Sequence, residues 1–529
     1  MKTYKLLTLA LGAMISFNSC SDFLTTEMTD AKKNIESYYK TPVDALTALT
    51  GCYNGLDMIY NSGVAFPVAS EVFSDNCFGG TGAADGPGYA MIDEFNKTVS
   101  PSDISMFNDS WKAYYQAVYR CNVLIDHIDG AKGDSSITVL NQYKAEAKFL
   151  RAYLYFDMVR LWGNIPLVLT PTLDNVPQAA PADVYAQIMS DLRYAADTLK
   201  AAPYNVVPSG RATKWAAESL LARVYLFYTG YYNQATIGGE TASTALAAVE
   251  DVIKNSGHDL VSDFNTLWPA ASAAKKATYA GETNAEIVFS IKYSSTDDWS
   301  NGTGNHWMVM EGIRGQSIYP YQYGWGACTV DPKLYNAFSS GDSRQFASII
   351  SIADESLDFT SAKDQKEYTG YYLKKYSSLC DKNGKSIATN FMTGPSQDYF
   401  VIRYSDVLLM AAELGVQLGK PEAQGYLDKV RRRAGLASES VSKATILVER
   451  RLEFVGEGIR YWDLLRQGLE TAATTIANNT TVSIFHNGGT PPTAEQFKTQ
   501  IIATKGLQQI PNDQITLSSG ILIQNDGWK

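Results

Sequence analysis

Residues 211–230 read RATKWAAESLLARVYLFYTG, and their apolar side chains recur at the spacing of an α-helix. One apolar stripe consists of Ala217, Leu220, Leu221, Val224, Phe227 and Tyr228. Gly230 then ends the pattern, because glycine favours the end of a helix. A second helix is predicted at 242–254, before the sequence Asn-Ser-Gly. Two apolar-striped helices this close together predict a helical hairpin.

Small alanines lie where the helices at 211–230 and 242–254 would cross, which is typical of a tetratricopeptide-like repeat. Helical periodicity predicts further helices at 42–60, 103–128, 145–162, 182–200, 331–339, 403–419, 421–434 and 443–467. Strands are few, and residues 285–293, AEIVFSIKY, alternate apolar and polar side chains as a short strand does. The sequence therefore predicts a mostly α-helical scaffold of tetratricopeptide-like repeats with a few short strands.

The composition narrows the class of protein. The chain has 529 residues, 45% of them hydrophobic and 19% charged, which is ordinary for a globular protein. Its formal net charge of −10 argues against nucleic acid or anionic lipid as the main partner. The four histidines are widely spaced, so a histidine-rich metal site is not predicted. No metal and no cofactor is expected.

The first twenty residues, MKTYKLLTLALGAMISFNSC, have the layout of a bacterial lipoprotein signal. Lys2 and Lys5 precede an apolar run at 6–17 that is too short to span a bilayer permanently. Residues 1–19 are therefore predicted to be a signal peptide, after whose removal Cys20 carries a diacylglyceryl group and an N-acyl chain. Several acyl chains anchor a protein to a membrane without a spanning helix. The alternative is an ordinary secretory signal followed by an incidental cysteine.

Five cysteines follow Cys20 in the chain. They are Cys52, Cys77, Cys121, Cys328 and Cys380, and none forms a C-x-x-C motif. This spacing favours neither a redox motif nor a zinc finger. Scattered buried thiols are expected.

Three stretches, 74–102, 294–345 and 470–529, are rich in Gly, Ser, Thr and Asn and poor in helical periodicity. Long loops in a compact protein are usually functional. Within the second, residues 298–326 read DWSNGTGNHWMVMEGIRGQSIYPYQYGWG and place six tryptophans and tyrosines among glycines. Large rings normally lie in a core. These rings either pack the loop onto the helices or form a surface for a ligand.

Several motifs together resemble the SusD/RagB family of nutrient-binding outer-membrane lipoproteins. They are CSDFL (20–24), AEAKFLRAYLYFDMVRLWGNIPLV (145–168), ATKWAAESLLARVYLF (212–227), AEIVFSIKY (285–293), FVIRYSDVLLMAAE (400–413), ERRLEFVGEGIRYWDLLR (449–466) and LIQNDGW (522–528). The motifs occur in family order over the whole mature chain. One departure is Asp526-Gly527-Trp528, where the family often has Pro-Gly-Tyr after the asparagine.

The resemblance implies a single SusD-like domain over 20–529, a helical-repeat scaffold whose loop-rich excursions around 74–102 and 294–345 carry the ligand site. It implies a cell-surface protein, lipid-anchored in the outer membrane, that binds a polysaccharide or oligosaccharide. It also implies a partner, a SusC-like TonB-dependent transporter, which receives the ligand and on which the protein sits as a lid. Some members of the family bind peptide instead. No catalysis is implied.

The predicted carbohydrate-binding residues follow from how sugars are recognised. The C–H face of a sugar ring stacks on an aromatic ring, while its hydroxyls need polar partners. In the 294–345 excursion the candidates are Trp299, Trp307, Tyr321, Tyr323, Trp325, Asn301 and Asn305. In the 74–102 excursion they are Asp75, Asn76, Phe78 and Tyr89. The alternative is that the rings pack their own loops and that Asp75 and Asn76 cap a turn.

The carboxylates in VERRLEFVGEGIRYWDLLR, 448–466, also allow a glycoside hydrolase, which uses a pair of acidic residues. On a helix, however, Glu457 would lie near Arg460 and Asp463 near Arg466, and paired charges of this kind are structural. The favoured prediction is a glycan-binding protein without catalytic residues. A peptide-binding protein and a secreted glycoside hydrolase are the alternatives.

Overall fold

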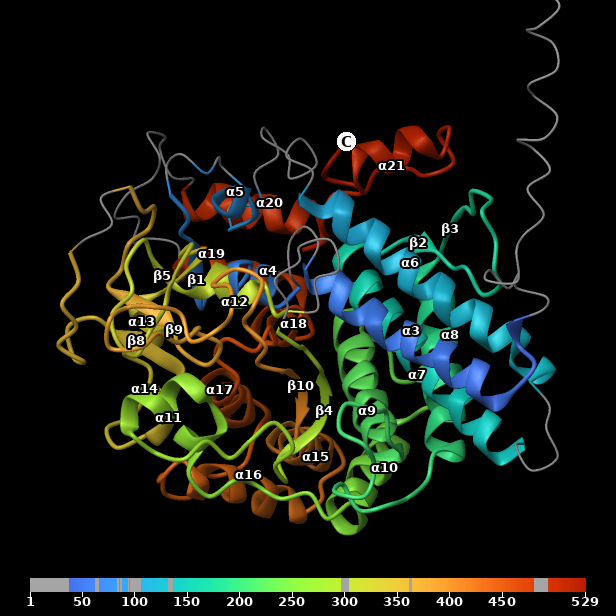
Figure 1. Ribbon diagram of the computed structural model, residues 1–529, viewed down its shortest axis with the longest axis horizontal. Helices are drawn as coiled ribbons and strands as arrows, with labels where there is room; N and C mark the ends of the chain where they lie inside the picture. Colours follow the sequence, from blue (N-terminus) through green and yellow to red (C-terminus); the bar gives the residue numbers. More distant parts are fainter. Residues whose placement is uncertain are drawn as a thin grey trace, which may run out of the picture.

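The computed structural model describes residues 38–61, 66–82, 85, 88–93, 95, 106–131, 137–295, 304–360, 364–479 and 493–529. Its long helices between residues 42 and 255, coloured blue to green, lie together on one side of the molecule, apart from the short blue helices at 66–72 and 88–93 (Figure 1). The yellow and orange segments, which contain most of the short strands, lie on the other side (Figure 1). The chain therefore separates a helical scaffold from a loop-rich part, as the sequence predicts.

Consecutive long helices pack against one another in pairs. The pairs are α3 (Pro42–Asn61) with α6 (Met106–His127), α7 (Ile137–Trp162) with α8 (Pro181–Thr198), α9 (Lys214–Tyr231) with α10 (Ala242–Asn255), and α15 (Tyr404–Gln417) with α16 (Glu422–Arg433). Thr213 and Thr241 cap α9 and α10, since each side chain accepts a backbone N–H of the first turn. The predicted tetratricopeptide-like pair is confirmed, and the fold is mostly helical.

The predicted helix over 443–467 is wrong, because two glycines interrupt it. Helix α17 (Lys443–Glu453) and helix α18 (Arg460–Leu465) flank a turn in which Gly456 and Gly458 have φ of 73° and 70°. A Cβ on Gly458 would lie 2.8 Å from Cα of Pro67. Both the backbone conformation and this close contact require glycine.

Shorter helices complete the described part of the chain. They are α4 (Phe66–Val72), α5 (Gly88–Asp93), α11 (Pro269–Lys275), α12 (Trp307–Glu311), α13 (Pro332–Tyr335), α14 (Ser343–Ser348), α19 (Leu469–Asn479), α20 (Ala494–Ala503) and α21 (Asn512–Leu517), with 3-10 turns η2 (Ile128–Gly130) and η3 (Phe264–Leu267). Helix α13 is shorter than the predicted 331–339. None of the helices in the described ranges is both long and apolar enough to cross a membrane.

The predicted strand over 285–293 is confirmed as β4 (Ile287–Ile291), which pairs antiparallel with β10 (Tyr399–Arg403). A second sheet has the order β1-β7-β9-β8 and is formed by β1 (Cys77–Gly79), β7 (Cys328–Val330), β9 (Tyr371–Leu373) and β8 (Ile349–Ser351). The two-residue pairs are β2 (Ile165–Pro166) with β3 (Gln178–Ala179) and β5 (Ile313–Arg314) with β6 (Tyr323–Gly324). The pairing of β1 with β7 ties the 74–102 excursion to the 294–345 excursion.

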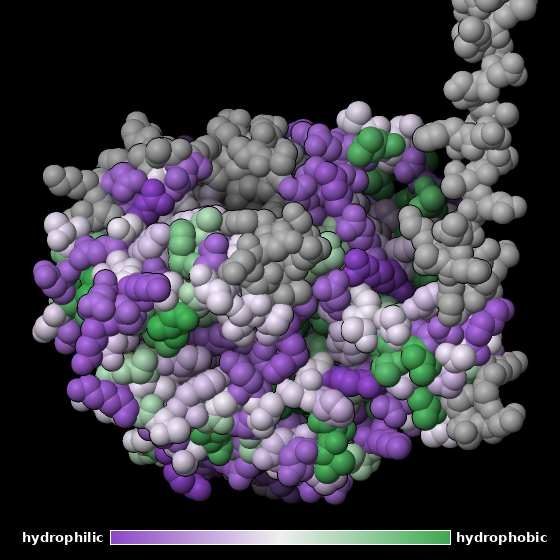
Figure 2. All heavy atoms as spheres, viewed as in Figure 1, coloured by the Kyte–Doolittle hydropathy of each residue, from purple (hydrophilic) through white to green (hydrophobic). Residues whose placement is uncertain are grey.

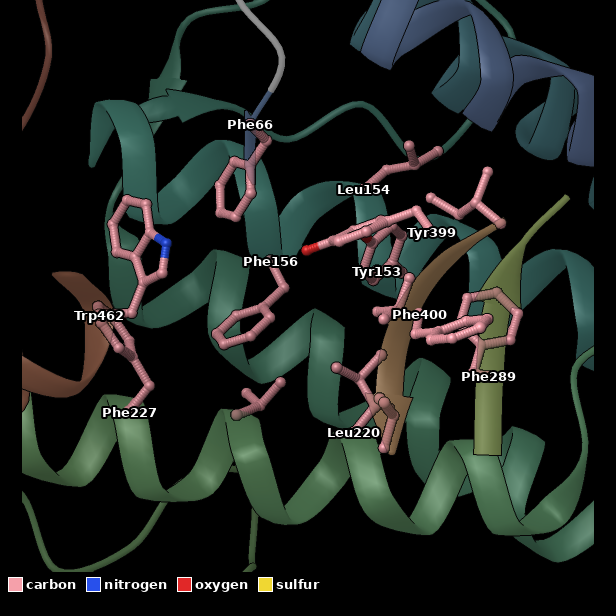
Figure 3. Packing of buried hydrophobic residues seen from close by; sticks show 14 of the residues in the cluster. Phe66, Tyr153, Leu154, Phe156, Leu220, Phe227, Phe289, Tyr399, Phe400 and Trp462 are labelled. Carbon is pink, nitrogen blue, oxygen red and sulfur yellow. The ribbon is translucent and has the colours of Figure 1, made fainter. Parts of the chain in front are cut away.

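The hydrophobic core joins the helical scaffold to the loop-rich part. Side chains of α7, α9, β4, β10 and α18 meet in it (Figure 3). Phe66 and Trp462 stack with ring centroids 5.2 Å apart, and Phe156 contacts Phe227 edge to face. Since one large cluster of buried residues runs from Tyr39 to Leu522, distant parts of the sequence share this core, and a small second cluster surrounds Tyr321.

Buried ion pairs hold the last helices onto this core. Arg403 bonds to Glu286, Glu453 and Glu457, and all four side chains are buried. Asp463 pairs with Arg466 at 2.8 Å, as the sequence predicts.

The predicted neighbour pair of Glu457 and Arg460 is replaced by longer-range contacts. Glu457 bonds to Lys375 and Arg403, while Arg460 bonds to Asp75. Within the described residues, the carboxylates of this stretch are held by arginines and lysine, which fits the structural interpretation of its charges.

The five cysteines that the sequence predicts to be buried thiols are buried and free. Cys52 lies on α3 and Cys121 on α6, while Cys77 and Cys328 lie on the paired strands β1 and β7.

Candidate ligand-binding site

Three residues of the predicted site in 298–326 lie inside the core. Trp307 is 0% exposed, with the rings of Tyr376 and Tyr399 at centroid distances of 4.5 and 5.5 Å. Tyr321 is also 0% exposed, and its hydroxyl bonds to Glu355 at 2.5 Å. Asn305 is fully buried, and its amide nitrogen donates a hydrogen bond to the carbonyl of residue 397. These side chains pack the loop, so they present no face to a ligand.

The predicted polar residues of the 74–102 excursion are buried for an electrostatic reason. Asp75 accepts two hydrogen bonds from Arg460, at 2.7 and 2.9 Å, and Arg451 lies 3.1 Å away. The two guanidinium groups outweigh the effect of burial and hold the pKa of Asp75 below its usual value. Asn76 bonds to Glu71 and Arg451. These contacts assign both residues to the loop's own structure.

Phe78 is buried on β1, where it faces Thr329 of β7. Tyr89 on α5 is half-buried, and its hydroxyl donates to the sulfur of Met310 at 3.1 Å. The ring of Phe78 is therefore closed to a sugar, while Tyr89 keeps part of its surface. Trp299 and Asn301 lie outside the described residues.

Tyr323 and Trp325 remain candidates, because both are half-buried rather than enclosed. The ring of Tyr323 lies against Phe391, with centroids 4.6 Å apart and planes inclined by 37°. Trp325 meets His306 edge to face at 5.3 Å. Tyr319 was not among the predicted site residues, but its side chain is 48% exposed. It lies in a turn that is closed by backbone hydrogen bonds between residues 318 and 321. The described part of the excursion therefore offers a group of accessible rings.

A cavity of about 350 Å³ lies among the loop segments that flank Phe391 in the sequence. Segments 377–379, 386–389 and 394–397 line it, together with Glu282, Ser295 and Met308. The carbonyl of Ser378 accepts the backbone N–H of residue 322, and Phe391 lies between the second and third lining segments. Phe391 therefore belongs to the loop that forms two of the lining segments, and the backbone next to Tyr323 is bonded to the third.

The cavity is lined by neutral polar groups and short apolar ones. Its serines and threonine include Ser295 and Thr389, whose hydroxyls bond to each other at 2.9 Å. Ser386 accepts the backbone N–H of residue 388, which leaves its own O–H to donate. Ser378 Oγ and Gln397 Oε1 are buried and have no hydrogen-bond partner among the described residues. Polar groups of this kind suit a ligand with many hydroxyls.

Glu282 is the one carboxyl group among the described lining residues of this cavity. Burial, and then the nearby charge of Asp398, raise its pKa to about 8. Asp398 itself forms an ion pair with Lys292 and donates its backbone N–H to Glu282 at 3.3 Å. A neutral Glu282 beside this ion pair leaves the cavity wall without net charge near pH 7.

Figure 2 shows the face of the molecule that is also drawn in Figure 1. Hydrophilic and hydrophobic residues are mixed over the described part of this face, and the hydrophobic ones form scattered patches (Figure 2). This face therefore has no broad apolar surface in its described part, and a hollow with aromatic rings nearby is the better candidate for a ligand site.

The fold defines a class of protein, a helical-repeat protein with a loop-rich part, and the candidate site lies on that part. Two family models match the sequence: the SusD family over residues 355–528, and the family described as starch-binding and associating with the outer membrane over residues 28–226. The chain belongs to the SusD family.

Relatives match along nearly the whole chain. SusD-like protein P2 of Formosa agariphila is 25% identical over 501 residues, which are 88% of this chain and 91% of the relative. A solved laminarin binding SusD-like protein has a TM-score of 0.72 and 28% identity, covering 92% of this chain and 99% of its own. Surface glycan-binding protein A from Bacteroides thetaiotaomicron, in complex with laminarihexaose, has a TM-score of 0.73 at 24% identity and covers 92% and 100%. At 24% identity, the similarity to this last protein shows that the two chains share a fold.

Proposed function

We propose that the protein is a cell-surface glycan-binding protein whose ligand lies against Tyr323 and Phe391. The observation that carries this proposal is the half-buried ring pair, whose Phe391 lies in the loop between two segments that line a cavity with hydroxyls and an amide. A sugar chain can stack its C–H faces on the rings while its hydroxyls bond to the cavity wall. Tyr319 and Trp325 extend the accessible ring surface on the same excursion.

Laminarin is the first glycan to test. A solved relative at 28% identity is a laminarin binding SusD-like protein, and it matches this chain over nearly its whole length. The neutral wall around Glu282 agrees with an uncharged polysaccharide. We therefore propose laminarin or a related neutral glycan as the ligand.

We infer that the glycan is bound and not cleaved. Glycoside hydrolysis needs two carboxyl groups on either side of the scissile bond. Glu282 is the single carboxyl among the described residues that line the cavity, and Asp398 beside it is held by Lys292. The acidic residues of 448–466 are bound to arginines and lysine in the core.

We propose that Cys20 carries the lipid anchor and that residues 20–529 form one domain on the outer surface of the outer membrane. The lipoprotein-type sequence ending at Cys20, the family description and the shared core from Tyr39 to Leu522 support this. In this position the protein would pass glycan to a SusC-like TonB-dependent transporter and cover it as a lid. Mass spectrometry of the purified chain should find acyl groups on Cys20, and a Cys20→Ala variant should leave the membrane fraction.

Affinity gel electrophoresis tests the glycan-binding proposal. The full-length chain, purified in detergent, is run through gels that contain laminarin or other plant and microbial polysaccharides. We expect at least one glycan to retard the wild-type chain. The Tyr323→Ala/Phe391→Ala variant should migrate through the same gel without retardation. The matched control is Tyr335→Ala/Tyr371→Ala, since these two half-buried rings also stack, with centroids 4.4 Å apart, but lie outside the loop that forms the cavity wall. Retardation by a peptide ligand alone would contradict the proposal.

A further inference from the structure

A second cavity, the α3 cavity, lies between helix α3, strand β4 and the loop at 209–211. Its volume of about 460 Å³ is within the about 300–1,000 Å³ found for small-molecule sites. The lining residues of α3 run from Leu46 to Asp57 at helical spacing, so one face of this helix forms the wall. None of the described residues that line the α3 cavity also lines the cavity around Phe391, so different residues build the two hollows.

Asp57 is the one carboxyl group among the described residues that line the α3 cavity. Its side chain is half-buried, and no hydrogen bond or ion pair joins it to another described residue. The described wall also holds two cations, and each has a carboxylate of its own. Arg211 pairs with Glu146, and Lys292 pairs with Asp398. Within the described residues, Asp57 is therefore left without a positive partner.

The surroundings of Asp57 favour a positive partner with an apolar body. Burial, and then the charge of Asp398, raise the pKa of Asp57 to about 8, because a carboxylate is poorly solvated there. An ammonium ion beside the carboxyl would offset this cost through charge-assisted hydrogen bonds. Leu46, Leu49 and the half-buried ring of Tyr53 line the same cavity and offer an apolar surface to the rest of a ligand.

We propose that the α3 cavity binds a small molecule with a primary ammonium group, which pairs with the carboxylate of Asp57. The body of the molecule lies against Leu46, Leu49 and Tyr53. An amino sugar and the N-terminal residue of a short peptide both carry such a group. This site goes beyond the proposed glycan function and is independent of it, because its residues belong to other segments of the chain.

Isothermal titration calorimetry at pH 7 on the full-length chain in detergent tests the proposal, with detergent alone as the blank. Cyclohexylamine and cyclohexanol share a ring and differ in the ammonium group. The amine should bind the wild-type chain at least about tenfold more tightly than the alcohol, since hydrogen bonds to charged groups are the stronger ones.

Asp57→Asn keeps the size of the side chain and removes its charge, so the variant should bind the amine at least about tenfold more weakly than the wild-type chain does. The matched control is Asp126→Asn, because Asp126 is exposed on α6 and does not line the cavity. Asp57→Asn should not lower the free energy of unfolding, since it removes a carboxyl that has no partner among the described residues.

A second pair of variants tests the place of binding without changing a charge. Thr50→Phe puts a ring into the cavity from an exposed position on α3 and should weaken amine binding at least about tenfold. Thr47→Phe is its control, since Thr47 is exposed on the same helix and does not line the cavity. Circular dichroism of each variant confirms that it is folded.

Two further ligand pairs distinguish the sources of the ammonium group. Glucosamine is compared with glucose, and leucinamide with 4-methylpentanamide, which lacks only the amino group. A larger gain in affinity from the amino group in the first pair supports the site as one for amino sugars. A larger gain in the second pair supports it as one for peptide N-termini.

Equal affinity of the wild-type chain for cyclohexylamine and cyclohexanol would overturn the proposal. A preference for the amine that persists in Asp57→Asn, or amine binding that is unchanged in Thr50→Phe, would overturn it as well. So would the absence of binding by all three amines. The proposed glycan function stands or falls separately, because the affinity gels measure it with the Tyr323→Ala/Phe391→Ala variant.

Discussion

Trp307 and Tyr323 come from the same aromatic excursion, and the structure gives them opposite roles. Trp307 is fully buried against Tyr376 and Tyr399, while Tyr323 is half-buried against Phe391. A buried tryptophan removes about 150–250 Å² from water, which is worth about 4–6 kcal/mol at about 25 cal/mol per Å². Trp307→Ala should therefore lower the free energy of unfolding by about 3–5 kcal/mol, in line with other large core truncations.

Tyr323→Ala should lower the free energy of unfolding by less than about 1 kcal/mol, because its ring is partly exposed. Urea denaturation followed by circular dichroism measures both values, and laminarin affinity gels measure binding by the same proteins. Trp307→Phe is the control, since it refills much of the space and should recover part of the lost stability. A Trp307→Ala variant with unchanged stability and lost glycan retention would refute the assignment of Trp307 to the core.

Three further predictions follow from the buried charges. Arg403→Met leaves the carboxylates of Glu453 and Glu457 without a main partner. It should lower the free energy of unfolding, measured by urea denaturation, by about 3–5 kcal/mol. An unchanged urea midpoint would contradict a stabilising role for these ion pairs. Asp75→Ala should lower that free energy by about 1–3 kcal/mol and leave glycan retention of the folded protein intact, whereas selective loss of binding would return Asp75 to the site. The pKa of Glu282 is raised from 4.5 to about 8, so the folded state binds the proton of this carboxyl more tightly than the unfolded state does. The resulting contribution to the free energy of unfolding is complete below pH 4.5 and is lost as pH rises to about 8. Relative to Glu282→Gln, the wild-type protein should therefore lose about 1 kcal/mol per pH unit between pH 6 and 8; parallel stability curves would show that the carboxyl is ionised throughout.

The scaffold was predictable because its signals are local. The stripe of apolar residues in 211–230 and the threonine caps specify α9 and α10 within a few residues of the chain. The charged stretch 448–466 was correctly interpreted as structural, but its glycine turn was missed. Gly456 and Gly458 lie in a segment whose charges and apolar residues still recur at helical spacing, so periodicity alone predicted one helix instead of two.

The site was harder to predict because burial in loops depends on partners far along the chain. Asp75 is buried by Arg460, which lies 385 residues away, and no local pattern records that contact. Trp307 and Tyr323 have similar glycine-rich surroundings in sequence, yet Tyr376 and Tyr399 enclose only the first.

The cavity itself was not predicted from the sequence. Its walls at 377–379, 386–389 and 394–397 contain no aromatic cluster or charged motif. Phe391 is a single ring among Asn, Met, Thr and Gly, and it becomes notable only through its contact with Tyr323. The pairing of these two segments arises from tertiary structure, because the backbone of residue 322 bonds to Ser378.

The central claim is that a glycan binds at the ring pair and its cavity. Hydrogen–deuterium exchange of the full-length chain, with and without saturating laminarin, locates the binding site without any substitution. The account predicts slower exchange in peptides covering 316–326 and 377–397, with little change in the paired helices α7 to α10. Protection confined to 74–102 or to those helices, with no change around Tyr323 and Phe391, would contradict it.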